Sequence, residues 1–218
     1  MNSYTEENYL KAIYHLSANG NQSVSTNSIA AAMNTKAASV TDMLKKLFEK
    51  KLINYARYQG VSLTDEGKMI AVSIVRKHRL WEFFLVEKLQ FKWDEVHEVA
   101  EELEHITSTE LINRLDKFLG YPKHDPHGDP IPDINGRFNQ SELKPISTLL
   151  VNETGIIMGV REHLPPFLQY LEKMRLTIGN RIKVIEVADY DQSVVIQLNH
   201  EDTFSISRDV AKNILVTI

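Results

Sequence analysis

Residues 75–105 read VRKHRLWEFFLVEKLQFKWDEVHEVAEELEH, and this stretch decides how the rest of the chain is interpreted. His78 and Glu82 are four residues apart, so on a helix they lie one turn apart on the same face. A second helix, beginning at Trp93–Asp94, is expected to carry a stripe of similar groups, namely His97, Glu101, Glu104 and His105. We therefore expect two neighbouring helices that present imidazole and carboxylate groups.

Imidazole and carboxylate groups without thiols are the ligand set of divalent cations such as Mn²⁺, Fe²⁺ or Zn²⁺. Two such helices packed side by side could supply roughly four to six ligands. The alternative is that the glutamates form an ordinary solvated helix face and that each histidine is incidental. The combination, in a chain with eight His in total, favours a metal site.

The composition limits the class of protein. With 218 residues, 43% of them hydrophobic, the chain can form one large domain or about two to three small ones. The absence of Cys excludes disulfides and thiolate ligands. No apolar run is long enough for a membrane span and the first residues do not resemble a signal peptide, so we expect a cytoplasmic protein. The net charge of −4 argues against a general polyanion binder, although basic residues outnumber acidic ones in residues 1–76 and residues 94–116 are acidic.

The beginning of the chain is expected to form three helices. Ser3-Tyr4-Thr5-Glu6 fits a capping box and starts the first helix. Ser25 or Thr26 can cap a short second helix over residues 27–33, and Thr35 can cap a third. The third helix is expected to bury one stripe, made of Val40, Met43, Leu44 and Leu47.

Two short β-rich runs with a turn at Gln59–Gly60 follow, which completes the pattern of a winged helix-turn-helix. In this arrangement the third helix enters the major groove of DNA and the hairpin lies along the phosphates. Winged helices also bind proteins, so a protein-binding module is the alternative. The candidate DNA contacts are Thr35, Lys36, Ser39, Thr41, Lys45, Arg57 and Tyr58.

A long helix is expected from Thr64 to about Leu89, leading from the winged helix directly to the first pair of ligands. The apolar WEFFL segment of this helix is expected to pack in the protein core or in a dimer interface. Another helix is expected over residues 108–119, followed by a loop over 120–138 that is rich in Pro and Gly. This loop is either an ordinary polar connection between two elements or a source of further metal ligands, namely His124, Asp125, His127 and Asp129.

The last part of the chain has a different pattern. Residues 141–152 are expected to be a linker, and from Gly155 onward five short apolar runs with one helical insert at 165–174 predict a small β-barrel. A glycine-rich phosphate loop and a Gly-x-Ser-x-Gly motif are absent from the sequence, so it does not indicate an enzyme. The expected fold class is mainly α with a small β-domain.

In order along the chain, a winged helix, VRKHRLWE, VHEVAEELEH, DPHGDPIP and a small β-domain resemble the diphtheria-toxin-repressor and manganese-transport-regulator family of metal-activated repressors. The resemblance implies a winged helix-turn-helix DNA-binding domain at 1–74, a helical metal-binding and dimerisation domain at 75–140, and an SH3-like (FeoA-type) β-barrel domain at 153–218. It also implies a homodimer that binds double-stranded operator DNA when its metal sites are filled and thereby represses metal-uptake genes. The resemblance implies neither binding to a membrane nor a small-molecule substrate other than metal ions.

The resemblance also assigns ligands. Glu101, Glu104 and His105 correspond to the family's primary site, which a first-helix residue, here Asn8, completes. The ancillary site corresponds to His78, Glu82 and His97. Additional ligands in some family members would fall on Asp125, His127, Glu162 and His163.

Two departures bear on the choice of ion. Iron-type members have Cys where this chain has Glu101, and an oxygen ligand favours Mn²⁺ over softer ions. The position of Asn8 is usually Asp or Met, so Asn8 would bring an oxygen without charge. We expect Mn²⁺, or Fe²⁺, at about two ions per subunit, as the resemblance implies. An iron-responsive repressor of the same fold is the first alternative, and a metal-dependent hydrolase is another. The hydrolase lacks support because the HExxH spacing is absent.

Overall fold

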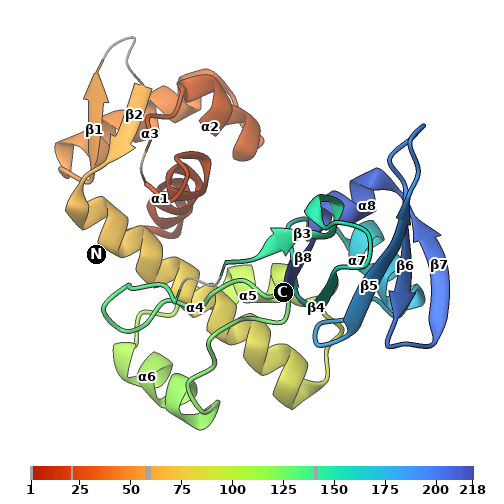
Figure 1. Ribbon diagram of the computed structural model, residues 1–218. Coiled ribbons are helices and arrows are strands. Elements are labelled where there is room, and N and C mark those ends of the chain that lie inside the picture. Colours follow the sequence, from red (N-terminus) through yellow and green to blue (C-terminus); the bar gives the residue numbers. More distant parts are fainter. Residues whose placement is uncertain (1, 21, 57–59, 140–141) are drawn as a thin grey trace. The chain divides into compact units, whose positions relative to one another are not determined.

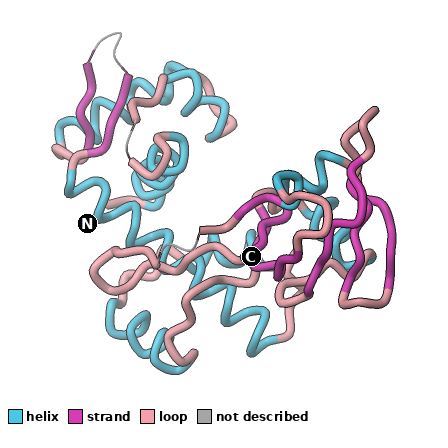
Figure 2. Tube along the Cα trace, in the orientation of Figure 1, coloured by secondary structure: helices cyan, strands magenta, loops and turns pink. Residues whose placement is uncertain are grey.

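The computed structural model describes residues 2–20, 22–56, 60–139 and 142–218 (Figure 1). The chain forms two compact units, each assembled from segments that are distant in sequence. The first unit comprises residues 1–81, 101–118 and 132–138, and the second comprises 82–100, 119–131 and 139–218. The first unit is mainly helical, and the second contains the larger sheet together with several helical segments (Figure 2). In the described part of the chain, no helix is both long enough and apolar enough to cross a membrane.

The first unit begins with α1 (Tyr4–Leu16), α2 (Thr26–Ala32) and α3 (Ala37–Glu49). The capping box is confirmed: Ser3 Oγ accepts from the Glu6 amide, and Glu6 Oε2 accepts from the Ser3 amide. Ser25 caps α2, as the sequence predicted. The prediction that Thr35 caps α3 is wrong, because the N-cap of α3 is Lys36. The Thr35 amide instead donates to the Ala30 carbonyl in the turn that closes α2.

The core of the first unit lies between α1, α3 and a hairpin. Three residues of the predicted α3 stripe, Val40, Leu44 and Leu47, are completely buried, while Met43 is only partly so. The strands β1 (Ile53–Ala56) and β2 (Gly60–Leu63) pair antiparallel after α3. Helix, turn, helix and hairpin therefore follow each other as the winged helix-turn-helix pattern predicted.

Three further helices carry the stretch that began the sequence analysis: α4 (Asp65–Leu89), α5 (Val96–Leu103) and α6 (Thr109–Phe118). The long helix α4 is confirmed. The prediction that one helix carries all four ligand-type residues up to His105 is wrong, because α5 ends at Leu103 and Glu104 and His105 lie in the following turn. The chain leaves helical geometry there because Ser108 caps α6, with its hydroxyl accepting from the Leu111 amide.

The second unit contains a six-stranded antiparallel sheet in the order β3-β8-β4-β5-β6-β7. Its elements are β3 (Lys144–Pro145), the 3₁₀ helix η1 (Ile146–Thr148), β4 (Thr154–Val160), α7 (Pro165–Lys173), β5 (Arg181–Val187), β6 (Val194–Leu198), β7 (Asp202–Ile206), α8 (Arg208–Asn213) and β8 (Ile214–Thr217). Alternate residues of these strands, together with Leu168 and Leu171 of α7, form a separate apolar core. The helical insert is therefore confirmed.

The prediction of a closed barrel is wrong, because β3 and β7 stand at opposite ends of an open sheet. Strand β3 is only two residues long and one of them is Pro145, which has no amide to donate to a further strand. Lys144 to Thr148, within the segment expected to be a linker, supply β3 and η1, and Ile146 is completely buried in the core. The sheet thus begins earlier in the sequence than the apolar runs suggested.

Candidate metal centres

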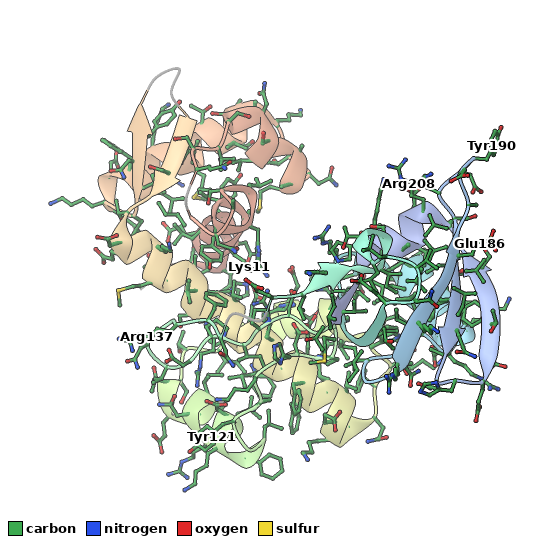
Figure 3. The ribbon with its side chains drawn as sticks, in the orientation of Figure 1. Lys11, Tyr121, Arg137, Glu186, Tyr190 and Arg208 are labelled. Carbon is green, nitrogen blue, oxygen red and sulfur yellow. The ribbon has the colours of Figure 1, made fainter. Side chains whose placement is uncertain are left out.

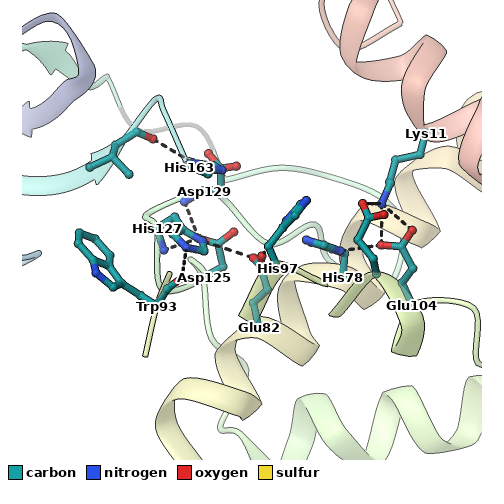
Figure 4. Close-up of polar contacts among 12 residues, drawn as sticks. Lys11, His78, Glu82, Trp93, His97, Glu104, Asp125, His127, Asp129 and His163 are labelled. Carbon is teal, nitrogen blue, oxygen red and sulfur yellow. Dashed lines mark hydrogen bonds and ion pairs between the residues drawn. The ribbon is translucent and has the colours of Figure 1, made fainter. Parts of the chain in front are cut away.

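One group of ligand-type side chains, which we call cluster one, consists of His78, Glu101 and Glu104 in the first unit. The potential ligand atoms of these residues all lie within 4.8 Å of one another. His78 Nδ1 is 2.6 Å from Glu104 Oε2, and the Glu104 side chain is completely buried. Lys11 extends from α1 into this cluster (Figure 3, Figure 4). Its Nζ donates to Glu101 Oε1 at 2.8 Å and to both oxygens of Glu104 at 2.6 and 2.8 Å.

A second α1 residue, Glu7, also reaches this region. Its Oε2 lies 2.7 Å from His105 Nδ1, and the His105 ring stacks on Tyr4 with 4.6 Å between ring centres. His105 Nε2 is 3.9 Å from Glu104 Oε1, so the ring lies beside cluster one with one nitrogen held by α1. Burial lowers the pKa of the neighbouring Lys77, although the charges of Glu7 and Glu104 oppose this shift.

Asn8 provides the test of whether these residues fit a cation. Its Oδ1 is buried and has no hydrogen-bond partner among the described residues. Asn8 is three residues before Lys11, so both lie on the face of α1 that supplies Glu7 and Lys11 to the cluster. A buried acceptor without a donor is unfavourable, and a cation would satisfy it. Two carboxylates, two imidazoles and this amide oxygen are a donor set that fits a divalent ion such as Mn²⁺ or Fe²⁺.

A different group, cluster two, lies in the second unit: potential ligand atoms of Glu82, Asp125 and His127 lie within 4.8 Å of one another, and His97 joins them through its contact with Glu82 (Figure 4). The buried Glu82 carboxylate is 3.4 Å from His97 Nδ1 and 3.5 Å from His127 Nδ1. Asp125 Oδ1 is 4.0 Å from His127 Nδ1. These separations exceed those of good hydrogen bonds. They are close to the spacing of about 3 to 3.6 Å between ligands that share one ion with bonds of about 2.1 Å.

The loop that carries Asp125 and His127 is shaped by its backbone. Asp125 Oδ1 accepts from the amides of His127 and Asp129 at 2.8 and 3.0 Å, and the His127 carbonyl accepts from the Val160 amide of β4 at 2.9 Å. His127 Nε2 donates to the Trp93 carbonyl at 2.8 Å. This bond directs the other ring nitrogen, Nδ1, toward Glu82, as in metal sites where a backbone carbonyl orients a ligating imidazole.

The charges of cluster two act strongly on its imidazoles. Burial lowers the pKa of His127, but the polar contact with Glu82, the charges of Glu82 and Asp125, and the Trp93 carbonyl outweigh it and raise the pKa to about 9. The ring of His163 stacks on His127 with 4.7 Å between ring centres. Burial and the charge of His127 lower the pKa of His163, against the opposing charges of Asp129 and Glu82. Without a bound cation, His127 therefore carries a proton at neutral pH that offsets the two buried carboxylates.

Comparison with known proteins gives three family models that match the chain in order. They are described as the iron dependent repressor N-terminal DNA binding domain (residues 1–61), the iron dependent repressor metal binding and dimerisation domain (residues 64–133), and the FeoA domain (residues 144–218). An uncharacterised helix-turn-helix transcriptional regulator of Methanocaldococcus jannaschii is 37% identical over 117 residues, which cover 54% of this chain and 94% of that protein. The chain belongs to the iron-dependent repressor family.

Other members of the iron-dependent repressor family support the same assignment. The iron-dependent repressor IdeR of Mycobacterium bovis is 33% identical over 130 residues, which cover 60% of this chain but only 56% of IdeR. A solved manganese-dependent transcriptional repressor in complex with manganese is 31% identical over 97% of this chain and 98% of that one, with a TM-score of 0.85. The family resemblance predicted from the motifs is thus confirmed, and its members are metal-dependent repressors that bind DNA rather than enzymes.

For this member of the iron-dependent repressor family, the structure places the predicted ligands as follows. Glu101 and Glu104 meet His78 in cluster one, with His105 beside them, while Glu82 and His97 meet Asp125 and His127 in cluster two. Of the two remaining candidates, Glu162 lies near Asn213 Nδ2 at 3.4 Å and is not among the residues grouped in cluster two. His163 reaches cluster two through its ring contact with His127, and its Nε2 donates to the Val160 carbonyl.

Sequence reasoning missed Glu7 and Lys11. The four-residue spacing of Glu7 and Lys11 on α1 was visible in the sequence, but it equally fits an exposed helix ion pair.

The candidate DNA contacts lie around the turn between α2 and α3. Thr35, Lys36, Ser39 and Lys45 are exposed, and an open hollow of about 610 Å³ is lined by Asn34, Thr35, Lys36 and Ser39 together with Ala30 and Ala31. Thr41 is partly exposed, and its hydroxyl donates to the Ala37 carbonyl. Arg57 and Tyr58 lie outside the described residues.

Proposed function

We propose that this chain is a manganese-activated transcriptional repressor that binds operator DNA as a homodimer in the cytoplasm and controls metal-uptake genes. The observation that carries the proposal is the pair of clusters, each composed of carboxylates and imidazoles, in a chain of the iron-dependent repressor family. A thiol-free donor set favours Mn²⁺ over softer ions, and Fe²⁺ is the other candidate. The proposed division of labour is DNA binding by residues 1–74, metal binding and dimerisation by 75–140, and a supporting β-domain over 153–218.

The proposed ligands follow the two clusters, with about two ions per subunit. Cluster one would use Glu101, Glu104, His105 and Asn8, the family's primary site, with His78 close to Glu104. Cluster two would use Glu82 and His97, to which Asp125 and His127 add two buried groups. A bound dication would supply the positive charge that neutralises the carboxylates of each cluster.

Cluster one offers a physical route from metal to DNA. Glu7, Asn8 and Lys11 belong to α1, which packs in the same core as α3, whereas Glu101 and His105 belong to α5 and the turn after it. Side chains from both segments converge on one position, so an occupied site would favour one arrangement of α1 relative to α5. Because a two-fold operator requires a fixed distance between paired α3 helices, that preference would raise DNA affinity.

The exposed face of α3 is the proposed reading surface. Lys36 and Lys45 would contact phosphates, and Ser39 and Thr41 would approach base edges from the start of the helix. Within the described parts of the chain, Lys45 Nζ pairs with Asp42 at 3.1 Å on an exposed surface, so it is available to a phosphate at little cost.

The test is fluorescence anisotropy with DNA from the region upstream of the protein's own gene and of candidate uptake genes. The full chain is titrated in chelator and then, anaerobically, in Mn²⁺, Fe²⁺ or Zn²⁺. We expect a gain in affinity with micromolar Mn²⁺ that Glu101→Ala and His105→Ala abolish. Glu110→Ala is the matched control, because Glu110 is an exposed carboxylate on α6 that, among the described residues, forms an ion pair with Arg114 rather than with a proposed ligand. Equal affinity in chelator and in Mn²⁺ would refute metal activation.

A further inference from the structure

The Lys11 ammonium group lies where cluster one would otherwise hold a cation. Its Nζ is 2.8 Å from Glu101 Oε1 and 2.6 and 2.8 Å from the two oxygens of Glu104. Lys11 thus engages both carboxylates of a cluster whose potential ligand atoms lie within 4.8 Å of one another. The Lys11 side chain is 13% exposed and that of Glu104 is completely buried, so bulk water screens these contacts poorly.

Two positive charges cannot share these oxygens without cost. An ammonium hydrogen and a metal ion use the same lone pairs of a carboxylate, and like charges a few ångströms apart repel strongly in a buried site. Glu104 also accepts from His78 through Oε2, so Lys11 and His78 together already make three short contacts to its two oxygens. A dication can therefore reach both glutamates only if the ammonium group withdraws.

We propose that Lys11 is a resident cation of cluster one, which holds Glu101 and Glu104 in the metal-free protein and must be displaced when a divalent ion binds. This inference rests on the proposed function, because it takes the two glutamates to be metal ligands. Lys11 then lowers the metal affinity of the cluster and sets the ion concentration at which the repressor responds. It also keeps α1 attached to α5 and its following turn when no ion is bound.

The orphaned oxygen of Asn8 agrees with this assignment. The Lys11 ammonium group, in its present position, donates to both carboxylates but leaves the buried Asn8 Oδ1 without a donor from the residues that the structure describes. Replacement of the ammonium by a metal ion would give that oxygen a partner. In the metal-free arrangement one ammonium group thus faces two carboxylates, and one buried oxygen lacks a donor among the described residues, whereas a dication would match both carboxylates in charge and also serve that oxygen.

The experiment compares Lys11→Met with the unmodified residue in a full-chain Glu82→Gln background, in which cluster two is disabled and only cluster one titrates. Methionine keeps the unbranched apolar stem of lysine, ends one atom earlier and removes the charge. Calorimetric titration with Mn²⁺ should show an affinity about ten- to a hundred-fold higher for Lys11→Met, since charge-assisted hydrogen bonds to a buried carboxylate are lost only from the metal-free state.

Thermal unfolding provides an independent readout. Lys11→Met should lower the melting temperature of the metal-free protein and have little effect at saturating Mn²⁺, because a displaced lysine no longer contributes. The two measurements form a thermodynamic cycle and must agree. An equal loss of stability with and without Mn²⁺, or an unchanged metal affinity, would overturn the proposal and leave Lys11 a structural residue.

Lys50→Met is the matched control. Lys50 donates to Glu6 Oε2 at 2.8 Å, so it also pairs with a buried glutamate of the first unit, but none of the proposed ligands is involved. It should lower stability equally in both states and leave metal affinity unchanged. If Glu82→Gln protein binds no Mn²⁺ and adding Glu101→Ala changes nothing, the proposed metal function of cluster one fails together with this inference. If it binds Mn²⁺ and Lys11→Met has no effect, only the inference fails.

Discussion

Gly128, in the loop of cluster two, tests how the β-domain shapes that cluster. Its φ of +88° is a conformation that side chains disfavour, and a Cβ built there would lie 2.1 Å from the Met158 carbonyl oxygen and 2.3 Å from Gly159 Cα. Both neighbours are backbone atoms of β4, so no side-chain rotation can relieve the overlap. Gly128→Ala must therefore move the loop away from the strand by about 1 Å to reach ordinary van der Waals contact.

The size of the effect follows from two contributions. Forcing alanine into the left-handed region costs about 1 to 2 kcal/mol. Moving the loop also strains the bond from the Val160 amide to the His127 carbonyl, now 2.9 Å, and a buried pair left unmade costs about 1 to 3 kcal/mol. We expect Gly128→Ala to lower the free energy of unfolding of the second unit by about 3 kcal/mol or more.

Gly120→Ala separates the two contributions. Gly120 has a φ of +77° in the same unit, but among the described residues other than its chain neighbours no atom lies within 4 Å of a Cβ added there. It should cost only the conformational contribution, about 1 to 2 kcal/mol. Urea unfolding of metal-free protein, followed by tryptophan fluorescence, measures both variants, since Trp93 stacks on His127. Mn²⁺ affinity at cluster two should fall for Gly128→Ala alone. Equal unfolding midpoints for the two variants would refute the role assigned to the contact with β4.

Three further outcomes are expected. Ser3→Ala removes the capping box of α1 and should cost about 1 kcal/mol, measured by thermal unfolding of metal-free protein against Ser205→Ala on β7. The pKa of His127 is raised to about 9, so its stabilisation of metal-free protein is complete below pH 6.5 and lost as pH rises through 9. Metal must displace that proton, so calorimetry on Glu101→Ala should show affinity at cluster two increasing with pH over this range. Lys45→Ala should weaken binding to every DNA sequence alike and reduce its salt dependence, whereas Ser39→Ala should change the preference among sites in competition anisotropy.

The sequence predicted the features that depend on local chemistry. The capping box of α1, the buried stripe of α3 and the length of α4 follow from the spacing of a few neighbouring residues, and each is confirmed. The end of α5 could not be predicted in the same way. Helical spacing continues through Glu104 and His105, but the need to begin α6 at Ser108 ends the helix earlier. Competition between adjacent elements is not visible in the periodicity of either one.

Features that depend on contacts between distant segments were harder to predict from the sequence. From the sequence alone, Glu7 and Lys11 fit an exposed ion pair on one helix. Their contacts with Glu101 and His105 become evident only in the folded structure. The apolar runs after Gly155 predicted strands, but not whether the outer strands meet, because closure depends on the length and donors of the edges. Pro145 is plain in the sequence, but its role in ending the sheet follows only from the position of β3 at the sheet edge.

The two clusters are assembled in different ways, and this difference bears on how each would respond to an ion. Cluster one is joined to α1 by side-chain ion pairs and charged hydrogen bonds from Lys11 and Glu7, which a competing cation can exchange one by one. Cluster two depends on backbone bonds around Asp125 and on the close approach of Gly128 to β4, which leave little room for rearrangement. A conformational response requires a site whose ligand favours one of several accessible arrangements. We therefore infer that an ion in cluster one shifts the position of α1 and with it the proposed DNA-binding domain, residues 1–74. An ion in the preorganised cluster two would mainly add stability.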